Sequence, residues 1–183
     1  ITNAGARQGD SLILTKPLGS GVLFNAVRAG KFPLKELEKE VLPILASLNN
    51  IAMEKALSYD LHSCTDITGF GILGHSLEVA EGSGAHIVID FKALPLYPGA
   101  YDMYRKGQTT GSNKTNRALV AKYPLIMERT LKKAEDELLY DPQTSGGLLL
   151  SLPTADAMQL VNDLYTNGVN AVKIGDVIEG GVG

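Results

Sequence analysis

The chain has 183 residues, of which 44% are apolar and 20% are charged, a composition typical of a globular protein rather than a disordered one. Seventeen basic and 20 acidic residues give a net charge of -3, which offers no electrostatic case for nucleic acid binding. The single cysteine excludes an internal disulfide and a cysteine-based zinc site. No apolar run approaches the roughly 20 residues that span a bilayer, and no signal-peptide pattern is present. We therefore expect a cytoplasmic protein without nucleic acid or membrane partners.

Residues 1–10 are polar, and a short apolar segment suited to a buried strand, 12–14, follows them almost at once. Because they are polar and contain glycine, residues 1–10 are interpreted as an interdomain linker. The first residue is isoleucine rather than methionine, and a strand is expected within ten residues of it. The whole of 1–183 is interpreted as one domain of a longer protein. Turn signals at Pro17 and Gly19 precede a helix that is expected to end near Gly30.

Apolar residues spaced three or four apart from Leu34 to Leu57 predict an amphipathic helix. Pro43 removes a backbone donor within this segment, so we expect two helices or a kink at Leu42–Pro43, with the second piece ending near Ser58. The charged residues at the start of the segment are interpreted as a solvated helix face.

The middle of the chain predicts a helix, a strand and a further short helix. Residues 72–80 have helical spacing, and glycine at 82 or 84 is expected to end that helix. Residues 86–91 alternate between apolar and polar, which is typical of a half-buried strand. A short helix is expected between 97 and 106.

The last third of the chain begins with a polar stretch, 107–113, that is expected to be flexible. A helix is expected within 123–140, and a buried strand over 147–152. Thr154 is expected to act as the N-cap of a helix, and 169–174 predicts a last strand. Strands and helices thus alternate without a repeat, which predicts an α/β (α+β layered) domain with a mixed β-sheet and helices packed on it.

Asp66 is the first candidate for chemistry because it stands directly before a glycine-rich turn, Thr68–Gly71. A carboxylate at such a turn can bind a hard cation such as Mg²⁺. It can equally cap the turn by accepting nearby amide hydrogens. The sequence offers no carboxylate partner at a fixed spacing, so both roles stay open.

The second candidate is the segment Thr144–Gly147. Its hydroxyls and successive amides can cradle an anion, or it can be a tight turn that leads into the following strand. Cys64 has no histidine in a recognisable relation to it, so a buried inert thiol is favoured over a nucleophile. The three histidines lack zinc-ligand spacing, and His75 is expected to pack or hydrogen-bond within its helix.

Three segments in order carry a resemblance to a known family: Gly9–Gly19, Thr65–His75 and Asp141–Leu149. They resemble the signature segments of the carboxyl-terminal half of selenophosphate synthetase (selenide, water dikinase), in the aminoimidazole-ribonucleotide synthetase superfamily. The resemblance covers essentially the whole chain. It implies the carboxyl-terminal α/β domain of that superfamily, with the amino-terminal ATP-binding domain absent from this chain.

The resemblance also implies a reaction. ATP, selenide and water would give selenophosphate, AMP and phosphate with Mg²⁺ present, in a cytoplasmic homodimer formed largely through the amino-terminal domains. The family's motif aspartate binds magnesium, which carries over to Asp66, and Thr68 and Ser145 are expected as phosphate or selenide neighbours. The family's catalytic cysteine or selenocysteine and its lysine lie in a segment that this chain lacks. No catalytic residue is therefore assigned here, and we expect the chain alone to be inactive and to bind ATP weakly.

Two other functions remain open. The protein could be an ATP-dependent synthetase or kinase of the same superfamily with another substrate, although the Asp141–Gly147 segment argues against aminoimidazole-ribonucleotide synthetase and thiamine-phosphate kinase. It could also be a non-catalytic interaction domain, which a contiguous apolar patch near Leu12–Leu18 would indicate. The oligomeric state of the chain and the proteins that donate and accept selenium do not follow from the sequence.

Overall fold

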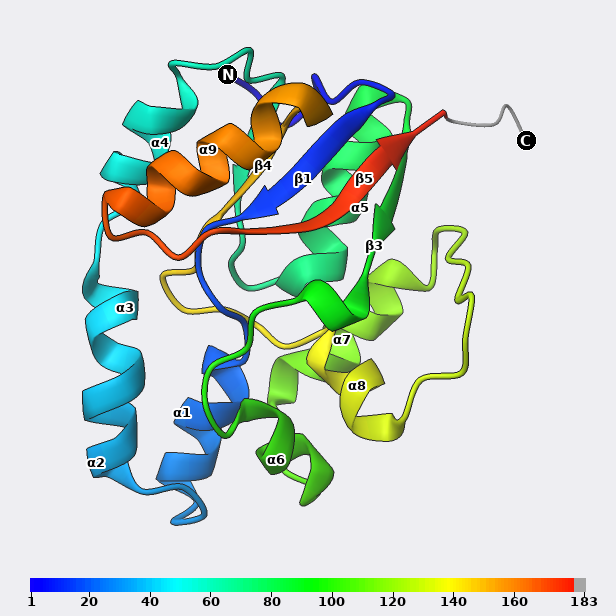
Figure 1. Cartoon of the computed structure of the whole chain (residues 1–183). Coiled ribbons are helices and arrows are strands. Elements are labelled where there is room, and N and C mark those ends of the chain that lie inside the picture. The colour runs from blue at the N-terminus through cyan, green and yellow to red at the C-terminus, as the bar shows by residue number, and fades with distance from the viewer. Residues whose placement is uncertain (180–183) are drawn as a thin grey trace.

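A computed structural model describes residues 1–179 and shows a five-stranded sheet with helices on both faces (Figure 1). The last four residues of the predicted domain lie outside the described residues. The order of strands in the sheet is β2–β4–β1–β5–β3, and all four ladders are antiparallel. The strands are β1 (Asp10–Leu14), β2 (Ser63–Asp66), β3 (His86–Ile89), β4 (Leu148–Pro153) and β5 (Val172–Ile178).

The helices are short, and within residues 1–179 none has the length and apolar character that crossing a membrane would require. Their bounds are α1 (Ser20–Arg28), α2 (Leu34–Glu36), the π-helical turn η1 (Leu37–Val41), α3 (Leu42–Ala46), α4 (Asn50–Ala56), α5 (Gly71–Ser83), the 3₁₀ turn η2 (Phe91–Ala93), α6 (Ala100–Arg105), α7 (Gly111–Val120), α8 (Lys133–Leu138) and α9 (Thr154–Thr166).

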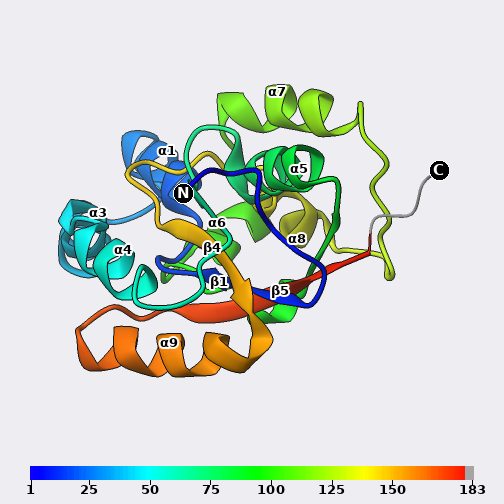
Figure 2. The same cartoon turned by 90° about the horizontal axis from the view of Figure 1, so that it is seen from above.

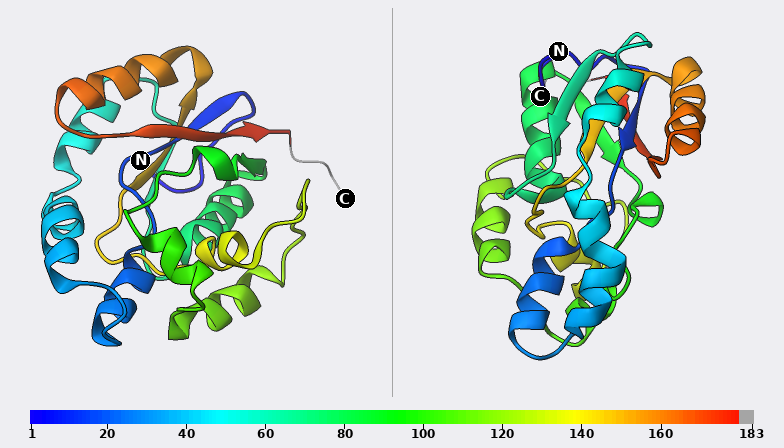
Figure 3. Two further views of the ribbon diagram at one scale, coloured as in Figure 1. Left: turned by 60° about the horizontal axis from the view of Figure 1, so that its bottom comes forward. Right: turned by 90° about the vertical axis from the view of Figure 1, so that its left-hand side faces the viewer.

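Helices α9 and α5 lie on opposite faces of the sheet (Figures 2 and 3), and α4 lies beside α9. Most of the other helices gather below the sheet in the view of Figure 1. Each face has its own apolar cluster. The cluster on the α9 side includes side chains from β1, β4, α4 and α9, among them Ile13, Leu150, Ala52 and Leu160. The cluster on the α5 side is larger and includes Leu12, Leu14, Ile72, Leu149 and Ile174.

Strand β1 is central because β4 and β5 pair with its two edges and helices cover both of its faces. Leu12, Ile13 and Leu14 are all 0% exposed, as expected for a strand that is buried on both faces. Leu18 is also buried. These apolar side chains near Leu12–Leu18 therefore lie in the interior and form no exposed patch.

The helical segment that starts at Leu34 breaks at a different place from the one predicted. A distortion at Leu42–Pro43 is confirmed, because the π-helical turn η1 passes directly into α3 there. Pro43 is tolerated because it lies in the first turn of α3, where a backbone N–H has no helical partner. The complete break comes later, where Ser47 is extended and α4 begins after Asn49.

Two further local predictions were wrong. The polar stretch 107–113, which was expected to be flexible, contains the start of α7, and the Thr110 hydroxyl N-caps this helix by accepting the amide of Asn113 at 3.3 Å. Thr154 is the first residue of α9 and does not cap it. Its hydroxyl instead donates to the carbonyl of Gly9 at 2.9 Å.

The layered α/β fold class is confirmed. The sheet itself is antiparallel, and in the described part of the chain the parallel pairing is an isolated bridge between Leu18 and Leu96. Most predicted elements are found close to their expected bounds. The last strand is displaced, since β5 spans 172–178 rather than 169–174.

The two candidate segments, which are about 75 residues apart in sequence, lie against each other through their backbones. The amide of Ile67 donates to the carbonyl of Gly147 at 2.9 Å, and the amide of Gln143 donates to the carbonyl of Thr68 at 2.9 Å. Gly146 allows this approach, because a Cβ at that position would overlap the carbonyl oxygen of Ile67. The fold therefore brings together the two segments that the sequence singled out.

The same region holds the start of α1. The amides of Gly19 and Ser20 donate to the side-chain oxygen of Gln143 at 3.1 and 3.2 Å. The next two amides, of Gly21 and Val22, donate to the carboxylate of Asp141 at 3.0 and 2.8 Å. The first amides of a helix have no partner within the helix, so side chains from a distant loop satisfy them here.

We predict that Gly146→Ala destabilises the domain by about 3 kcal/mol or more, because the new methyl group meets backbone rather than a flexible side chain. The measurement is the free energy of unfolding in denaturant. Gly111→Ala is the matched control, since nothing lies within 4 Å of its Cβ position. Equal stability of the two variants would contradict the packing described here.

We also predict that Gln143→Leu lowers the free energy of unfolding by about 3 kcal/mol, because it leaves buried amides of α1 without an acceptor. The control is Gln159→Leu, at an exposed position of α9, which should change stability by less than about 0.5 kcal/mol. A Gln143→Leu variant as stable as this control would show that α1 does not depend on the cap.

Candidate functional site

Asp66 is the last residue of β2, an edge strand of the sheet, and its side chain is exposed. Its backbone pairs with Leu148 of β4. Within residues 1–179 no hydrogen bond or ion pair uses its carboxylate, so it does not cap the following turn. The carboxylate is thus exposed and makes no polar side-chain contact within the described residues.

A complete metal site is not formed by the described residues. No group of three or more His, Cys, Asp and Glu side chains within residues 1–179 could hold a metal ion. Asp66 fits Mg²⁺ as one hard oxygen donor. It is not a full set of ligands.

Thr68 lies in the turn between β2 and α5 and is half-buried. Its carbonyl accepts from the amides of Gly71 and Gln143 at 3.1 and 2.9 Å, so its backbone position is fixed by both segments. Its hydroxyl lies 3.1 Å from Nε2 of His75. The expectation that His75 hydrogen-bonds within its own helix is confirmed, because Nδ1 lies 3.0 Å from Oε2 of Glu78 in α5.

Ser145 has a φ of 47°, a value unfavourable for a residue with a Cβ, and is alone in this among the non-glycine residues from 1 to 179. Its hydroxyl donates to the carbonyl of Leu45 at 2.8 Å. Its carbonyl accepts from the ammonium of Lys16 at 3.0 Å, and that ammonium also donates to the carbonyl of Ser47 at 2.8 Å. The Ser145 hydroxyl proton is therefore used in a hydrogen bond within the protein, and Thr144–Gly147 forms the tight turn considered above.

Lys16 is buried, at 4% exposed, and burial lowers the pKa of its ammonium group. Within the described residues no carboxylate lies within 4 Å of this ammonium. Its charge is held by backbone carbonyls of the Ser47 and Ser145 loops, which it joins. Lys16 is therefore a structural support of the second candidate segment.

Asp141 is 0% exposed, and burial raises the pKa of its carboxyl group to about 6. The hydroxyl of Tyr104, the amides of Val22 and Gly21 and the side chain of Gln143 all donate to it, which opposes this rise because they stabilise the carboxylate. Burial and the nearby carboxylate together raise the pKa of Tyr104. At neutral pH Asp141 is thus an ionised carboxylate surrounded by hydrogen-bond donors.

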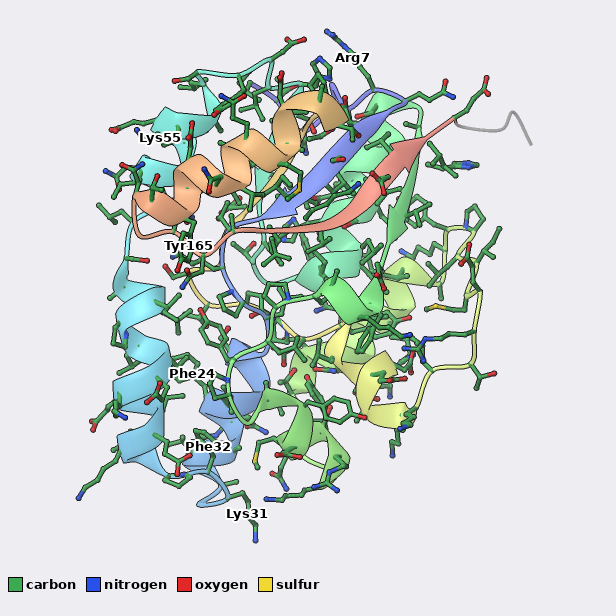
Figure 4. All side chains as sticks on the ribbon, in the orientation of Figure 1. Arg7, Phe24, Lys31, Phe32, Lys55 and Tyr165 are labelled. Carbon is green, nitrogen blue, oxygen red and sulfur yellow. The ribbon has the colours of Figure 1, made fainter. Side chains whose placement is uncertain are left out.

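Cys64 and His62 lie near Asp66 in sequence but form no nucleophilic pair. Cys64 is half-buried, and burial, followed by the charge of Asp66, raises the pKa of its thiol. His62 instead lies 2.8 Å from the buried carboxylate of Asp10, and its other nitrogen lies 2.8 Å from the guanidinium of Arg7, which is labelled at the top of Figure 4. The interpretation of Cys64 as an unreactive thiol fits these contacts.

Two surface hollows of the described chain are lined by residues other than Asp66 and Thr68. One of about 310 Å³ is lined by Thr144 together with Asn25, Arg28 and Thr110. Another of about 340 Å³ lies around Met127 and Lys133. The first borders the second candidate segment, and neither forms an enclosed pocket.

Sequence reasoning missed the contacts of Asp141, Gln143, Lys16 and Glu78. The available signal was the presence of charged and amide side chains within or beside segments predicted to be buried. The hydrogen-bond partners of these side chains could not be predicted from the sequence. The amides that donate to Asp141 and Gln143, for example, are about 120 positions away in the chain.

The model of a family described as "AIR synthase related protein, C-terminal domain" matches residues 7–183. A selenide, water dikinase of Treponema denticola is 40% identical over 164 residues, which cover 90% of this chain and 46% of that protein. One from Clostridioides difficile is 40% identical over 182 residues, which cover 99% of this chain and 52% of that protein. The chain spans about half the length of the curated relatives it matches.

Solved structures show the same fold at lower identity. A thiamine-monophosphate kinase from Stenotrophomonas maltophilia has a TM-score of 0.67 at 16% identity, over 98% of this chain and 51% of that one. The hydrogenase maturation protein HypE in complex with ATP has a TM-score of 0.64 at 19% identity, over 97% of this chain and 45% of that one.

The family model covers nearly the whole chain, and the structural neighbours share its layered architecture. The resemblance drawn from the three sequence segments is confirmed by the similarity to selenide, water dikinases. The chain belongs to the family of AIR synthase related proteins, as their C-terminal domain.

Proposed function

We propose that this chain is the C-terminal half of a selenide, water dikinase, which forms selenophosphate, AMP and phosphate from ATP, selenide and water. The observation that supports the proposal is 40% identity to proteins of that name over 90% and 99% of the chain. Identity to the thiamine-monophosphate kinase that shares the fold is 16%, so another substrate within the superfamily is less well supported. The interaction-domain alternative loses its expected apolar patch, because Leu12–Leu18 is buried.

In this proposal Asp66 binds Mg²⁺ at the edge of the sheet. Its exposed and unpaired carboxylate supports the role. Mg²⁺ prefers six oxygen ligands, so the others would come from the amino-terminal half, the substrate phosphates and water. The ion supplies neutralisation of charge on the phosphate oxygens when it is bound.

Thr68 and Ser145 are proposed to border the substrate phosphates. Thr68 is supported by its position two residues after Asp66 and by its half-buried hydroxyl. Ser145 is supported by its exposed place on the turn that packs against the Thr68 segment, and it would contribute through the shape of that turn because its hydroxyl proton is already bound to Leu45.

The remaining elements of the proposal concern the other half of the protein. ATP would be bound mainly by the amino-terminal half, which would also supply the nucleophilic residue. That half would form most of the contact in a cytoplasmic homodimer. This chain would then close one side of a shared site.

We predict that Asp66→Ala in the full-length protein lowers selenide-dependent AMP formation on the order of 10²-fold, because a charge-neutralising ligand is lost. Raising the Mg²⁺ concentration should restore part of the activity. The measurement is the initial rate of AMP formation across a magnesium titration. Asp102→Ala, which removes an exposed carboxylate of α6, is the control and should leave the rate unchanged. Full activity of Asp66→Ala would reduce Asp66 to a residue of the turn.

We predict further that the 183-residue chain alone does not hydrolyse ATP and binds it more weakly than micromolar, because most contacts to the nucleotide are proposed for the missing half. Isothermal titration of the chain with Mg²⁺ and ATP measures this affinity. The full-length protein titrated under the same conditions is the control. Micromolar binding by the chain alone would contradict the division of roles.

A further inference from the structure

Three side chains form a line at the start of α5: a hydroxyl, an imidazole and a carboxylate. The hydroxyl of Thr68 lies 3.1 Å from Nε2 of His75, and Nδ1 of His75 lies 3.0 Å from Oε2 of Glu78. His75 and Glu78 are three residues apart in one helix, so they share a face of it. Thr68 precedes that helix in the turn that follows Asp66.

The chemistry of the outer two groups fixes the proton of the middle one. An ionised carboxylate only accepts hydrogen bonds, so Nδ1 of His75 carries a proton toward Glu78. In neutral imidazole the other nitrogen is then an acceptor, and Nε2 takes its hydrogen bond from the hydroxyl of Thr68. The Thr68 hydroxyl donates its one proton to this hydrogen bond. Its oxygen can therefore only accept a hydrogen bond from any further partner.

These three side chains differ from an ordinary surface contact because the imidazole in the middle is buried. The side chain of His75 is 7% exposed, whereas that of Glu78 is 44% exposed and Thr68 is half-buried. The ring of Phe70 packs on His75 with 5.6 Å between ring centroids. The imidazole therefore has its two nitrogens fixed by polar partners. Both outer groups reach the surface in part, and Thr68 is the one that follows Asp66 by two residues.

Many enzymes remove a proton from an attacking hydroxyl or water by placing a base next to it. A third group then orients the base. In the proposed reaction the three phosphorus atoms of ATP end in three products, AMP, selenophosphate and phosphate. AMP keeps one of them, so selenide takes one of the other two phosphoryl groups and water takes the other. Hydrogen selenide is a far stronger acid than water and is already an anion at neutral pH. Water is the nucleophile that needs a base.

We propose that Thr68, His75 and Glu78 form a proton relay for the water-consuming step, an inference that rests on the proposed function. As the water oxygen bonds to phosphorus, a water proton passes to Oγ1 of Thr68 and the threonine proton passes to Nε2 of His75. The carboxylate of Glu78 stabilises the resulting imidazolium. The bond from phosphorus to the leaving oxygen breaks with its electron pair on that oxygen, and the relay returns the proton to it. No oxidant or further reactant is needed.

The competing role is structural, because the same contacts also tie the turn to the helix. The two roles predict different products. A relay affects the water-dependent product, phosphate, whereas loss of structure lowers both products together. Variants that keep the shape but lose the base therefore separate the roles.

The experiment is a single turnover of the full-length enzyme, with selenophosphate, phosphate and nucleotides followed by phosphorus NMR and chromatography. His75→Gln is expected to slow phosphate release by about 10²-fold while selenophosphate forms at the normal rate and the nucleoside diphosphate accumulates. Thr68→Val is expected to slow phosphate release by a larger factor than selenophosphate formation, because Thr68 is also proposed to border the substrate phosphates. The amide of His75→Gln can still accept from Thr68 but is not a base. Thr68→Ser, which keeps the hydroxyl, is expected to restore phosphate release.

Glu78→Gln tests the relay at a half-exposed position where the fold is least at risk, and the same imbalance of products is expected with a loss of about 10-fold. Glu81→Gln is its matched control, one turn further along α5, where the carboxylate accepts from Tyr123. Equal loss of both products in these variants, or unchanged products, would overturn the relay. An unmodified enzyme that forms no selenophosphate would instead overturn the proposed function, so the two failures can be told apart.

Discussion

A buried carboxylate and a neighbouring amide hold the beginning of helix α1. Asp141 and Gln143 accept from the first four amides of the helix, at Gly19, Ser20, Gly21 and Val22. The positive end of the helix dipole and the hydroxyl of Tyr104 stabilise the charge in return. Because the same loop also packs on the turn at Thr68, the position of the candidate site depends on this one set of hydrogen bonds.

The cap also determines which chemistry is available nearby. The amino end of a helix is a ready site for phosphate when its amides are free. In α1 these amides are already bound to protein oxygens, and the amide of Thr144 donates to the hydroxyl of Ser20. The proposed function accordingly places the contacts to substrate at Asp66 and Thr68 and not at the start of α1.

The sequence predicted the layered fold, the core strand at 12–14 and the two segments that meet at the site, because periodicity and glycine placement are local signals. It did not predict α7, since that helix has few apolar residues and its N-cap, Thr110, lay in a polar stretch. It singled out Asp66 as a candidate but did not predict the partners of Thr68 or of Asp141. Those contacts arise from packing between distant segments, and no spacing rule within one segment encodes them.

The order of the strands in the sheet has a consequence for how the domain folds. β1 is made early, but both strands that pair with it, β4 and β5, lie beyond residue 147. Strand β2 pairs with β4 as well, so it cannot join the sheet before β4 is made. Ladders between such distant segments close large loops before they gain stability, which slows folding. During synthesis strand β1, which is buried in the finished fold, therefore remains without its neighbours for most of the length of this chain. A nascent chain halted before β4 would be the form most prone to aggregate.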